Sequence, residues 1–140
     1  MCGGLRSYLG LCGHDAAYAP ERGVEADDRL AALADAEGRT LVTRDVDLAD
    51  RRADAIRLSS RETREQLREL RTVGVALSPA DEPTRCGACN GRLDVGAPGD
   101  PTPDYAPDPG RRAVWRCSDC GQYFCRGSHW DRMCEALAEL

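Results

Sequence analysis

The sequence predicts an α/β domain in which helices flank a parallel sheet, followed by a small domain built around a metal site. Two observations indicate this class. Helical and extended patterns alternate at the spacing of βαβ units over the first eighty residues, and two Cys-x-x-Cys pairs follow in a glycine- and proline-rich region. The length of 140 residues suits one domain with an appendage and excludes two full domains. We therefore predict an α/β domain over 1–79 and a metal-site domain over 80–140.

Four helices are expected in the first domain, because apolar residues recur there at helical spacing. The first covers 5–12 and ends before a glycine. The second covers 26–37, with acids in its first turn and Gly38 at its end. A short helix follows over 46–52. A Ser-x-x-Glu capping box at residues 59–62 then starts the last helix, which runs to about residue 73.

Three strands alternate with these helices, at 15–19, 39–43 and 55–58. The second contains the apolar pair Leu41 and Val42 and runs into a polar loop, which is typical of a buried strand. Strands separated by helices form a parallel sheet, and ligands bind beyond the carboxyl ends of its strands. Polar residues that directly follow a strand are therefore candidate site residues.

The charge composition is acidic, with a net charge of −5, and every one of the 19 basic residues is arginine. A halophile-like composition of this kind resembles proteins of high-salt cytoplasm, and a GC-rich coding bias produces the same pattern. No stretch approaches the roughly 18 apolar residues of a membrane span, and residues 1–13 make a poor signal peptide. We expect a cytoplasmic protein with no membrane partner, whose eight cysteines are thiols or metal ligands.

The cysteine spacing predicts a zinc ribbon, in which Cys86 and Cys89 form one Cys-x-x-Cys pair and Cys117 and Cys120 form the other. Four thiolates complete a tetrahedral zinc shell at about 2.3 Å and leave no open position for a catalytic water. We expect a closed structural zinc site, with an iron centre or non-metal cysteines as the alternatives. Because so short a domain buries little apolar surface, it would rely on the metal to fold. Its five prolines between residues 98 and 109 indicate an exposed loop.

Acidic residues follow the strand predicted at 39–43. Asp45 and Asp47 lie where a parallel sheet presents ligands, and Asp27 or Asp28 could add a third carboxylate from the start of the preceding helix. Such a cluster can hold Mg²⁺ or Mn²⁺ and support metal-assisted hydrolysis of a phosphodiester. The alternative is that Asp27 and Asp28 favour a helix start and that Asp47 is a helix cap.

Arginines recur at helical spacing, which places Arg61, Arg64, Arg68 and Arg71 on one helix face. This face could contact phosphates, or it could be a solvated surface in which Arg61 pairs with Glu65. We favour the solvated surface, since exposed ion pairs of this kind are common.

A histidine and a tryptophan near the end of the chain have two possible roles. His129 and Trp130 could stack on a base and touch a phosphate, or Trp130 could fill the core of the ribbon. Cys125 and Cys134 flank His129, but their spacing fits none of the usual metal-ligand patterns.

Several segments together resemble the C-terminal ribonuclease domain family of the mut-seven exonuclease, over roughly residues 1 to 134. They are GGLRSYLGLCGHDAAY, ADDRLAALADAEGRTLVTRDVDLA, TRCGACNGRL and CSDCGQYFCRGSHWDRM. The resemblance implies a PIN-like nuclease fold joined to a zinc ribbon, and an active site of clustered acids with a divalent metal.

The resemblance assigns individual residues. Asp45 and Asp47 match the strand-end acids of the family, and Asp27 matches its acid seven residues before an alanine, here Ala34. The ribbon ligands of the family match Cys86, Cys89, Cys117 and Cys120.

Two departures from the family pattern stand out. PIN-like domains begin with a hydrophobic strand that ends in an aspartate, and neither precedes the segment that starts at Met1. We expect this strand and its metal-ligating aspartate to lie upstream, in a reading frame for which Met1 is internal. The second departure is Cys125, where the family usually has an aromatic residue.

These observations predict a metal-dependent endoribonuclease that acts on RNA. Asp27, Asp45 and Asp47 are expected to hold Mg²⁺ or Mn²⁺, and Arg44 is expected to steady the phosphate. One alternative is a non-catalytic adaptor that binds RNA or associates with the ribosome through the ribbon and the arginines. Another is a protein-interaction module that does not touch nucleic acid.

Overall fold

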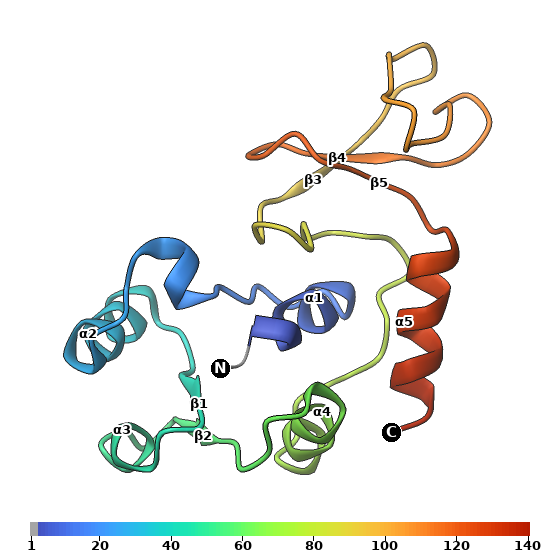
Figure 1. The fold of residues 1–140 in the computed structure, drawn as a ribbon. Coiled ribbons are helices and arrows are strands. Elements are labelled where there is room, and N and C mark those ends of the chain that lie inside the picture. The colour runs from blue at the N-terminus through green and yellow to red at the C-terminus, as the bar shows by residue number, and fades with distance from the viewer. Residues whose placement is uncertain (1–2) are drawn as a thin grey trace. The chain divides into compact units, whose positions relative to one another are not determined.

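The protein is described by a computed structural model that covers residues 3–140 (Figure 1). The chain forms two compact units. Unit 1 contains the residues up to Leu5 and the segment Tyr18–Ala76, and unit 2 contains Arg6–Ala17 and Leu77–Leu140. Helix α1 (Gly3–Leu11) therefore begins in unit 1 and continues into unit 2. Among the described residues, no helix has the length and apolar character needed to cross a membrane.

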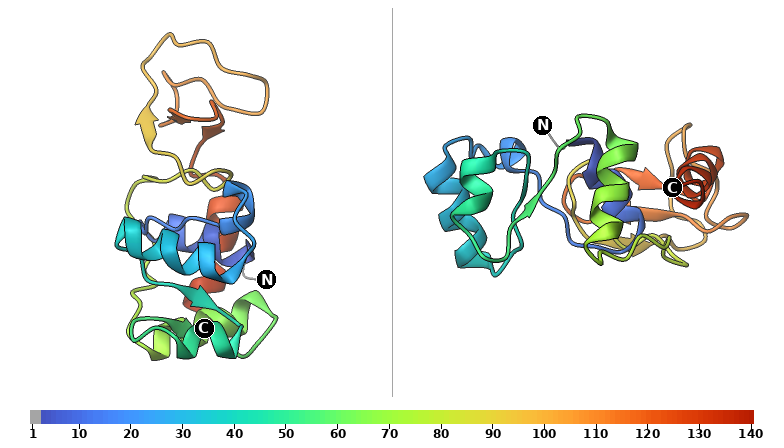
Figure 2. Two further views of the ribbon diagram at one scale, coloured as in Figure 1. Left: turned by 90° about the vertical axis from the view of Figure 1, so that its left-hand side faces the viewer. Right: turned by 90° about the horizontal axis from the view of Figure 1, so that it is seen from below.

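A small parallel sheet lies in unit 1, as predicted. Strand β1 (Val42–Thr43) pairs with strand β2 (Ile56–Arg57), with Val42 opposite Ile56. Helix α3 (Val46–Asp50) connects the two strands and packs against both of them (Figures 1 and 2). Unit 1 is thus mixed α/β, and each of its two strands is two residues long.

The strand predicted at residues 15–19 is wrong. The segment up to Tyr18 has no regular structure, and a 3₁₀ helix, η1 (Ala19–Arg22), follows it with Pro20 near its start. The amide of Ala16 donates to the side-chain Oδ1 of Asn90 at 3.1 Å, and Pro20 has no amide to donate. The donors that a sheet ladder requires are therefore used elsewhere or missing.

Helix α2 (Asp27–Glu37) confirms the helix predicted over this region. It ends at Gly38, whose positive φ of 63° lets its amide donate back to the carbonyls of Ala34 and Asp35. The side chain of Arg52, only 9% exposed, joins this helix to the chain that follows α3. It pairs with Asp35 at 2.5 Å and donates to the carbonyl of Ala31 at 3.1 Å.

Helix α4 (Thr63–Thr72) starts later than predicted, and the expected capping box does not form. The Glu69 carboxylate instead accepts the amides of Ser59 and Ser60, at 2.7 Å and 2.9 Å. Gln66, which is buried, donates to the Ser60 carbonyl at 2.8 Å. Two side chains from the helix thus fix the loop before it, which a local capping box would otherwise do.

Leucine dominates the core of unit 1, because the helices direct their apolar faces toward the sheet. The buried apolar residues of this unit are Leu5, Ala34, Leu41, Leu48, Ala49, Leu58, Leu67 and Leu70.

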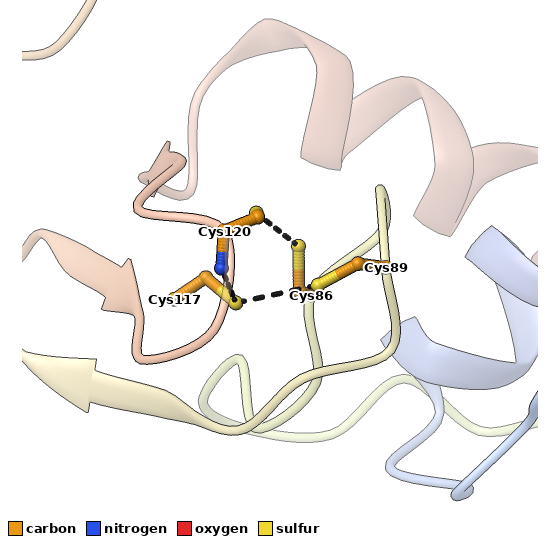
Figure 3. A group of neighbouring side chains, drawn as sticks. All are labelled: Cys86, Cys89, Cys117 and Cys120. Carbon is orange, nitrogen blue, oxygen red and sulfur yellow. Dashed lines mark hydrogen bonds between the residues drawn. The ribbon is translucent and has the colours of Figure 1, made fainter.

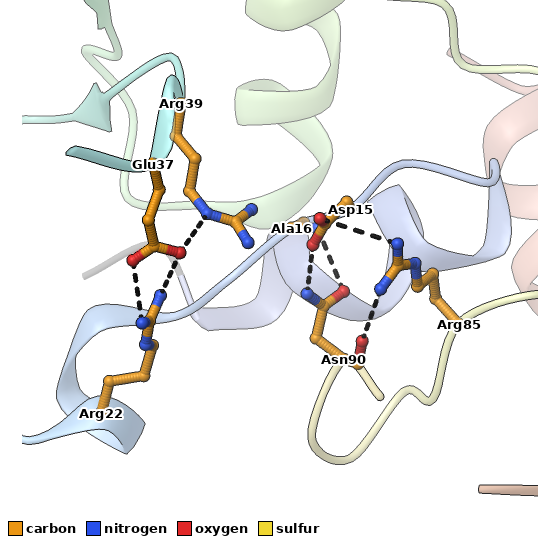
Figure 4. A network of polar contacts seen from close by, with 7 residues as sticks. All are labelled: Asp15, Ala16, Arg22, Glu37, Arg39, Arg85 and Asn90. Atoms are coloured by element: carbon orange, nitrogen blue, oxygen red, sulfur yellow. Dashed lines mark hydrogen bonds and ion pairs between the residues drawn. The ribbon is translucent and has the colours of Figure 1, made fainter. Parts of the chain in front are cut away.

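An ion-pair cluster lies on the surface of unit 1 (Figure 4). Glu37, at the end of α2, pairs with Arg22 at 2.8 Å and with Arg39 at 3.1 Å. Hydrogen bonds from Arg22 and then Arg39 lower the pKa of the Glu37 carboxyl below its usual value. The cluster connects η1 to the end of α2.

Unit 2 contains an antiparallel sheet of three strands in the order β3–β4–β5. The strands are β3 (Leu93–Val95), β4 (Trp115–Cys117) and β5 (Tyr123–Phe124). The proline-rich segment between β3 and β4 forms neither helix nor strand, as predicted.

Helix α5 (Ser128–Ala138) completes unit 2 and was not predicted. It buries Met133 and Leu137. Trp130 lies on this helix and is only partly buried, whereas Trp115 on β4 is 3% exposed. The tryptophan buried in the core of unit 2 is therefore Trp115, and Trp130, expected to fill that core, is only half-buried.

Candidate functional site

The four predicted ligands, Cys86, Cys89, Cys117 and Cys120, form a compact cluster in unit 2 (Figure 3). Their sulfur atoms all lie within 4.8 Å of one another. The Sγ atoms of Cys86 and Cys120 are 3.6 Å apart, and those of Cys89 and Cys117 are 3.5 Å apart. A tetrahedral zinc ion with bonds of about 2.3 Å requires sulfur atoms about 3.8 Å apart. The cluster can therefore hold a metal such as zinc.

Each cysteine pair lies on a tight turn of the backbone. In the first turn, Asn90 has a φ of 67°, and its amide donates to the Cys86 carbonyl at 2.9 Å. In the second turn, Gly121 has a φ of 77°, and its amide donates to the Cys117 carbonyl at 3.0 Å. A left-handed residue after each Cys-x-x-Cys pair directs both sulfurs of that pair to one side.

The turns also bring amides to the sulfur atoms. Ala88 donates its amide to Cys86 Sγ at 3.3 Å, and Asp119 and Cys120 donate theirs to Cys117 Sγ at 3.4 Å each. Amides directed at sulfur stabilise the thiolate, which is the form that binds metal.

A close contact leaves no room for a side chain at Gly91. A Cβ atom there would lie 2.7 Å from Cys117 Sγ and 2.7 Å from an Asp119 carboxylate oxygen. Glycine after Asn90 is thus required by the approach of the second cysteine turn to the first.

Burial raises the pKa values of thiols in the cluster, and amide hydrogen bonds lower them. Burial raises the pKa of the Cys86 thiol to about 12 and raises the pKa of Cys89. Burial also opposes ionisation of Cys117, but the amides of Cys120 and Asp119 and the neighbouring thiols outweigh it and lower that pKa to about 7. A divalent cation would favour ionisation of all four thiols, since cation charge offsets the repulsion between thiolates.

The first cysteine turn contacts the segment Arg6–Ala17 within unit 2, which sequence reasoning missed. Arg6 and Ser7 of α1 both donate to the Gly87 carbonyl, at 3.0 Å and 3.2 Å. Asn90 donates to Asp15 Oδ1 at 2.6 Å while it accepts the Ala16 amide (Figure 4). These partners lie 74 to 81 residues apart in the chain, so no local pattern could have indicated them.

The predicted acids Asp45 and Asp47 lie at the carboxyl end of β1, in unit 1. Asp45 is the N-cap of α3, where its Oδ1 accepts the Leu48 amide at 2.9 Å. Asp47 is exposed in the first turn of the same helix. Both acids therefore lie in the loop after the strand, as predicted. The residue that caps α3 is Asp45, whereas the alternative interpretation expected Asp47 to be the cap.

The third predicted acid, Asp27, is exposed in the first turn of α2, beside Asp28. The Asp28 carboxylate is 3.3 Å from Arg51, which ends α3. Asp28 is therefore at the opposite end of α3 from Asp45. Within residues 3–140, the four cysteines are the only group of three or more His, Cys, Asp or Glu side chains placed to share a metal ion. The structure does not bring Asp27 into such a group with Asp45 and Asp47.

Arg44, predicted to steady a phosphate, directly precedes the two acids. Its Nε is buried and has no hydrogen-bond partner in the structure. The Nε of Arg52 is buried in the same way although its guanidinium pairs with Asp35, so this feature does not by itself indicate a phosphate ligand at Arg44.

The arginine face of α4 carries an ion pair, although not the pair we expected. Glu65 pairs with Arg68, three residues later, rather than with Arg61. An exposed pair of this kind contributes little to stability.

His129 is exposed at the start of α5. Cys125, Cys134 and His129 form no group that could hold a metal in the described part of the chain.

The family comparison covers both units. A family model described as Mut7-C RNAse domain matches residues 1–137 of the chain. No curated protein and no solved structure matches it.

Proposed function

Because the chain belongs to the Mut7-C RNAse domain family, we propose that it is a PIN-like, metal-dependent ribonuclease that cleaves phosphodiester bonds within RNA. In this proposal residues 1–79 carry the nuclease chemistry, and residues 80–140 form a zinc ribbon. The observation that carries the proposal is the position of Asp45 and Asp47, directly after β1 in a chain of this family. The carboxyl ends of parallel strands are where α/β sheets bind their ligands.

The acidic loop offers the chemistry that a nuclease needs. Asp45 accepts the Leu48 amide through Oδ1, which orients its carboxylate, and Asp47 is exposed two residues later. Mg²⁺ is commonly held by one or two carboxylates together with substrate phosphates, so this donor set fits it. A divalent ion supplies charge neutralisation at the phosphate and activates water. Asp27 is the proposed third acid, and Arg44 would bind a phosphate oxygen through its guanidinium.

The zinc ion of the ribbon has a structural role in this proposal. Four cysteine ligands leave no open coordination position, and the buried Cys86 and Cys117 exclude solvent from half of the site. Metal analysis of the purified protein tests this, with one zinc per chain expected.

One substitution tests the nuclease proposal with little disturbance of the fold. Asparagine is as good an N-cap as aspartate, so Asp45→Asn preserves the bond to the Leu48 amide and removes the charge. We expect it to lower cleavage of labelled RNA in Mn²⁺ by about a hundredfold or more, a typical loss for a group that acts in the reaction. Asp50→Asn, an exposed acid on the same helix, is the matched control and should cleave normally.

The same assay assigns the other residues. Asp47→Asn and Asp27→Asn should each reduce cleavage, and Arg44→Gln should weaken RNA binding. Cleavage that survives Asp45→Asn would contradict the catalytic assignment.

A non-catalytic RNA-binding adaptor is the second candidate, and one observation favours it. Asp45 caps a helix and Asp28 pairs with Arg51, so acids of this region already have structural partners. Binding of RNA by the wild-type protein without any cleavage in Mg²⁺ or Mn²⁺ would establish the adaptor.

A further inference from the structure

One face of the sheet in unit 2 combines a half-buried tyrosine ring, an exposed tyrosine ring and an arginine. Strand β4 alternates buried, exposed and buried residues, so Trp115 and Cys117 face the interior and Arg116 faces outward. Arg116 is opposite Tyr123 of β5 in the register of the sheet. Its guanidinium carbon lies 5.8 Å from the centroid of the Tyr123 ring, which is within cation–π distance.

A second tyrosine joins this face from the proline-rich loop. The ring of Tyr105 lies edge-to-face against Tyr123, with centroids 6.5 Å apart and an interplanar angle of 66°. The side chain of Tyr105 is 61% exposed.

Hydrogen bonds fix both rings by their hydroxyl groups. The Tyr105 hydroxyl oxygen accepts the Tyr123 amide at 3.2 Å, and the Tyr123 hydroxyl donates to the Pro101 carbonyl at 3.3 Å. Since these contacts engage the hydroxyl groups, what the tyrosines offer a partner is mainly ring surface. Rings that are already oriented lose little conformational entropy on binding.

Two arginines on this face, Arg116 and Arg92, could contact an anionic partner, and one acid, Asp94, lies between them. In the described part of the chain, no carboxylate lies within ion-pair distance of Arg116, and none lies within that distance of Arg92. Arg92 lines a groove of about 640 Å³ with Arg85, Thr84 and Ser118. Asp94 lines the same groove and is opposite Arg116 in the sheet register, so the groove and the tyrosine face adjoin.

We propose that this face of unit 2, formed by Tyr105, Arg116 and Tyr123 with the adjoining Arg92 groove, binds single-stranded RNA. A base stacks on the exposed ring of Tyr105, which Tyr123 supports, and phosphates contact Arg116 and Arg92. A double helix keeps the faces of its bases stacked on one another, so only a single strand can offer them to the rings. The inference rests on the proposed function, since RNA is the substrate that function implies, and it assigns substrate binding to the ribbon.

Binding and cleavage are measured separately in the test. Fluorescence anisotropy with a labelled 12-nucleotide oligouridine, on the zinc-loaded full chain at low salt without Mg²⁺ or Mn²⁺, reports binding alone. We expect Tyr105→Ala to weaken binding about tenfold, which is the usual loss for one stacked base. Tyr105→Phe keeps the ring and should bind within about threefold of wild type.

The salt dependence of RNA binding tests the role of Arg116. Arg116→Gln should weaken binding and reduce the slope of log affinity against log salt by about one, because one phosphate contact is lost. Arg132→Gln on α5 makes the same change in charge outside the sheet and should leave both quantities unchanged. Zinc content and circular dichroism of each variant verify that the ribbon is folded.

Three results of the binding measurements would contradict the proposal. Wild-type affinity in Tyr105→Ala and Arg116→Gln, or equal affinity for duplex and single strand, would exclude this face as an RNA site. Absence of RNA binding at low salt would also overturn it and would favour a protein partner. If the face binds RNA as expected but the wild type cleaves none, the ribonuclease proposal fails and this one stands. Cleavage that depends on Asp45, with binding insensitive to Tyr105 and Arg116, gives the reverse result.

Discussion

The two units of the molecule differ in the side chains that their interiors bring together. Unit 1 buries leucines from its helices, including Leu48, Leu67 and Leu70, against a very short sheet. Unit 2 has a smaller apolar core around Val114 and Trp115, and its four cysteines converge on one point. Apolar burial is distributed over many contacts, whereas a metal centre concentrates its contribution in four ligands. We therefore expect the two units to unfold under different perturbations.

Removal of the metal should have the largest effect and should act on unit 2 alone. Structural zinc contributes about 10 kcal/mol or more to small metal-dependent folds, so a strong chelator should unfold the ribbon. Hydrogen-exchange mass spectrometry of the full chain should show lost protection in β3, β4 and β5, with α4 still protected. Loss of protection in both units would show that they do not fail independently.

Two cysteine-to-serine variants serve as the control for the chelator experiment. Cys117→Ser removes a ligand and should reproduce the effect of the chelator, while Cys125→Ser, outside the cluster, should retain the metal. Equal metal loss in both variants would contradict the assignment of the ligands.

A cavity in the leucine core should weaken unit 1 and leave the metal in place. Leu67 is 2% exposed, and Leu67→Ala should destabilise unit 1 by about 2–5 kcal/mol, because the lost contacts are only partly recovered by relaxation. Denaturant unfolding followed by circular dichroism measures the loss, and zinc content should stay at the wild-type value. A fall in zinc content would mean that the leucine core also supports the metal centre.

A side chain at Gly91 should weaken metal binding, but by less than the loss of a cysteine ligand would. Gly91→Ala places a methyl group 2.7 Å from Cys117 Sγ, so the two cysteine turns must separate, and we expect zinc affinity to fall about tenfold. Gly87→Ala in the same turn is the control, since its nearest side-chain atom would be 3.8 Å away. Competition with a chromophoric chelator measures both affinities, and equal values would refute the steric argument.

The surface ion pairs of unit 1 should have the smallest effect, and it should depend on pH. Arg22 and Arg39 lower the pKa of Glu37, so its ionised form is favoured in the folded state. The stabilisation is therefore present above the usual carboxyl pKa of about 4.3 and is lost as pH falls through the lower folded value. Glu37→Gln should unfold slightly earlier than wild type at pH 7, and the difference should vanish in acid. A difference that persists in acid would point to lost packing instead.

Much of the local structure could be predicted from the sequence. Gly38 ends α2 because a left-handed residue is needed there, and the spacing of four cysteines predicted the cluster that the structure contains. Helix α5 was not predicted, and it begins after Gly127 without a side-chain cap, so no capping hydrogen bond marks its start. Its buried residues Met133 and Leu137 are four apart, which is helical spacing.

The acidic loop shows where a sequence prediction needs more than spacing. Asp45 and Asp47 follow β1 as expected, but Asp27 lies in a different helix, and its position depends on how α2 packs. Arg52 and its contacts with Asp35 and Ala31 help to set that packing. None of these contacts is local in the chain.

The cysteine turns, the helices of unit 1 and the position of Asp45 and Asp47 after a strand follow from local sequence, because each depends on neighbours within a few residues. Tertiary contacts make Asn90 accept the Ala16 amide where a strand was expected, and they make Glu69 accept the amides of Ser59 and Ser60 in the loop before α4. They also bring Tyr105 and Tyr123 together, 18 residues apart, on the face with Arg116. A hydrogen bond or ring contact between residues far apart in the chain forms only after the intervening chain has folded and brought them together. Local sequence therefore cannot predict it.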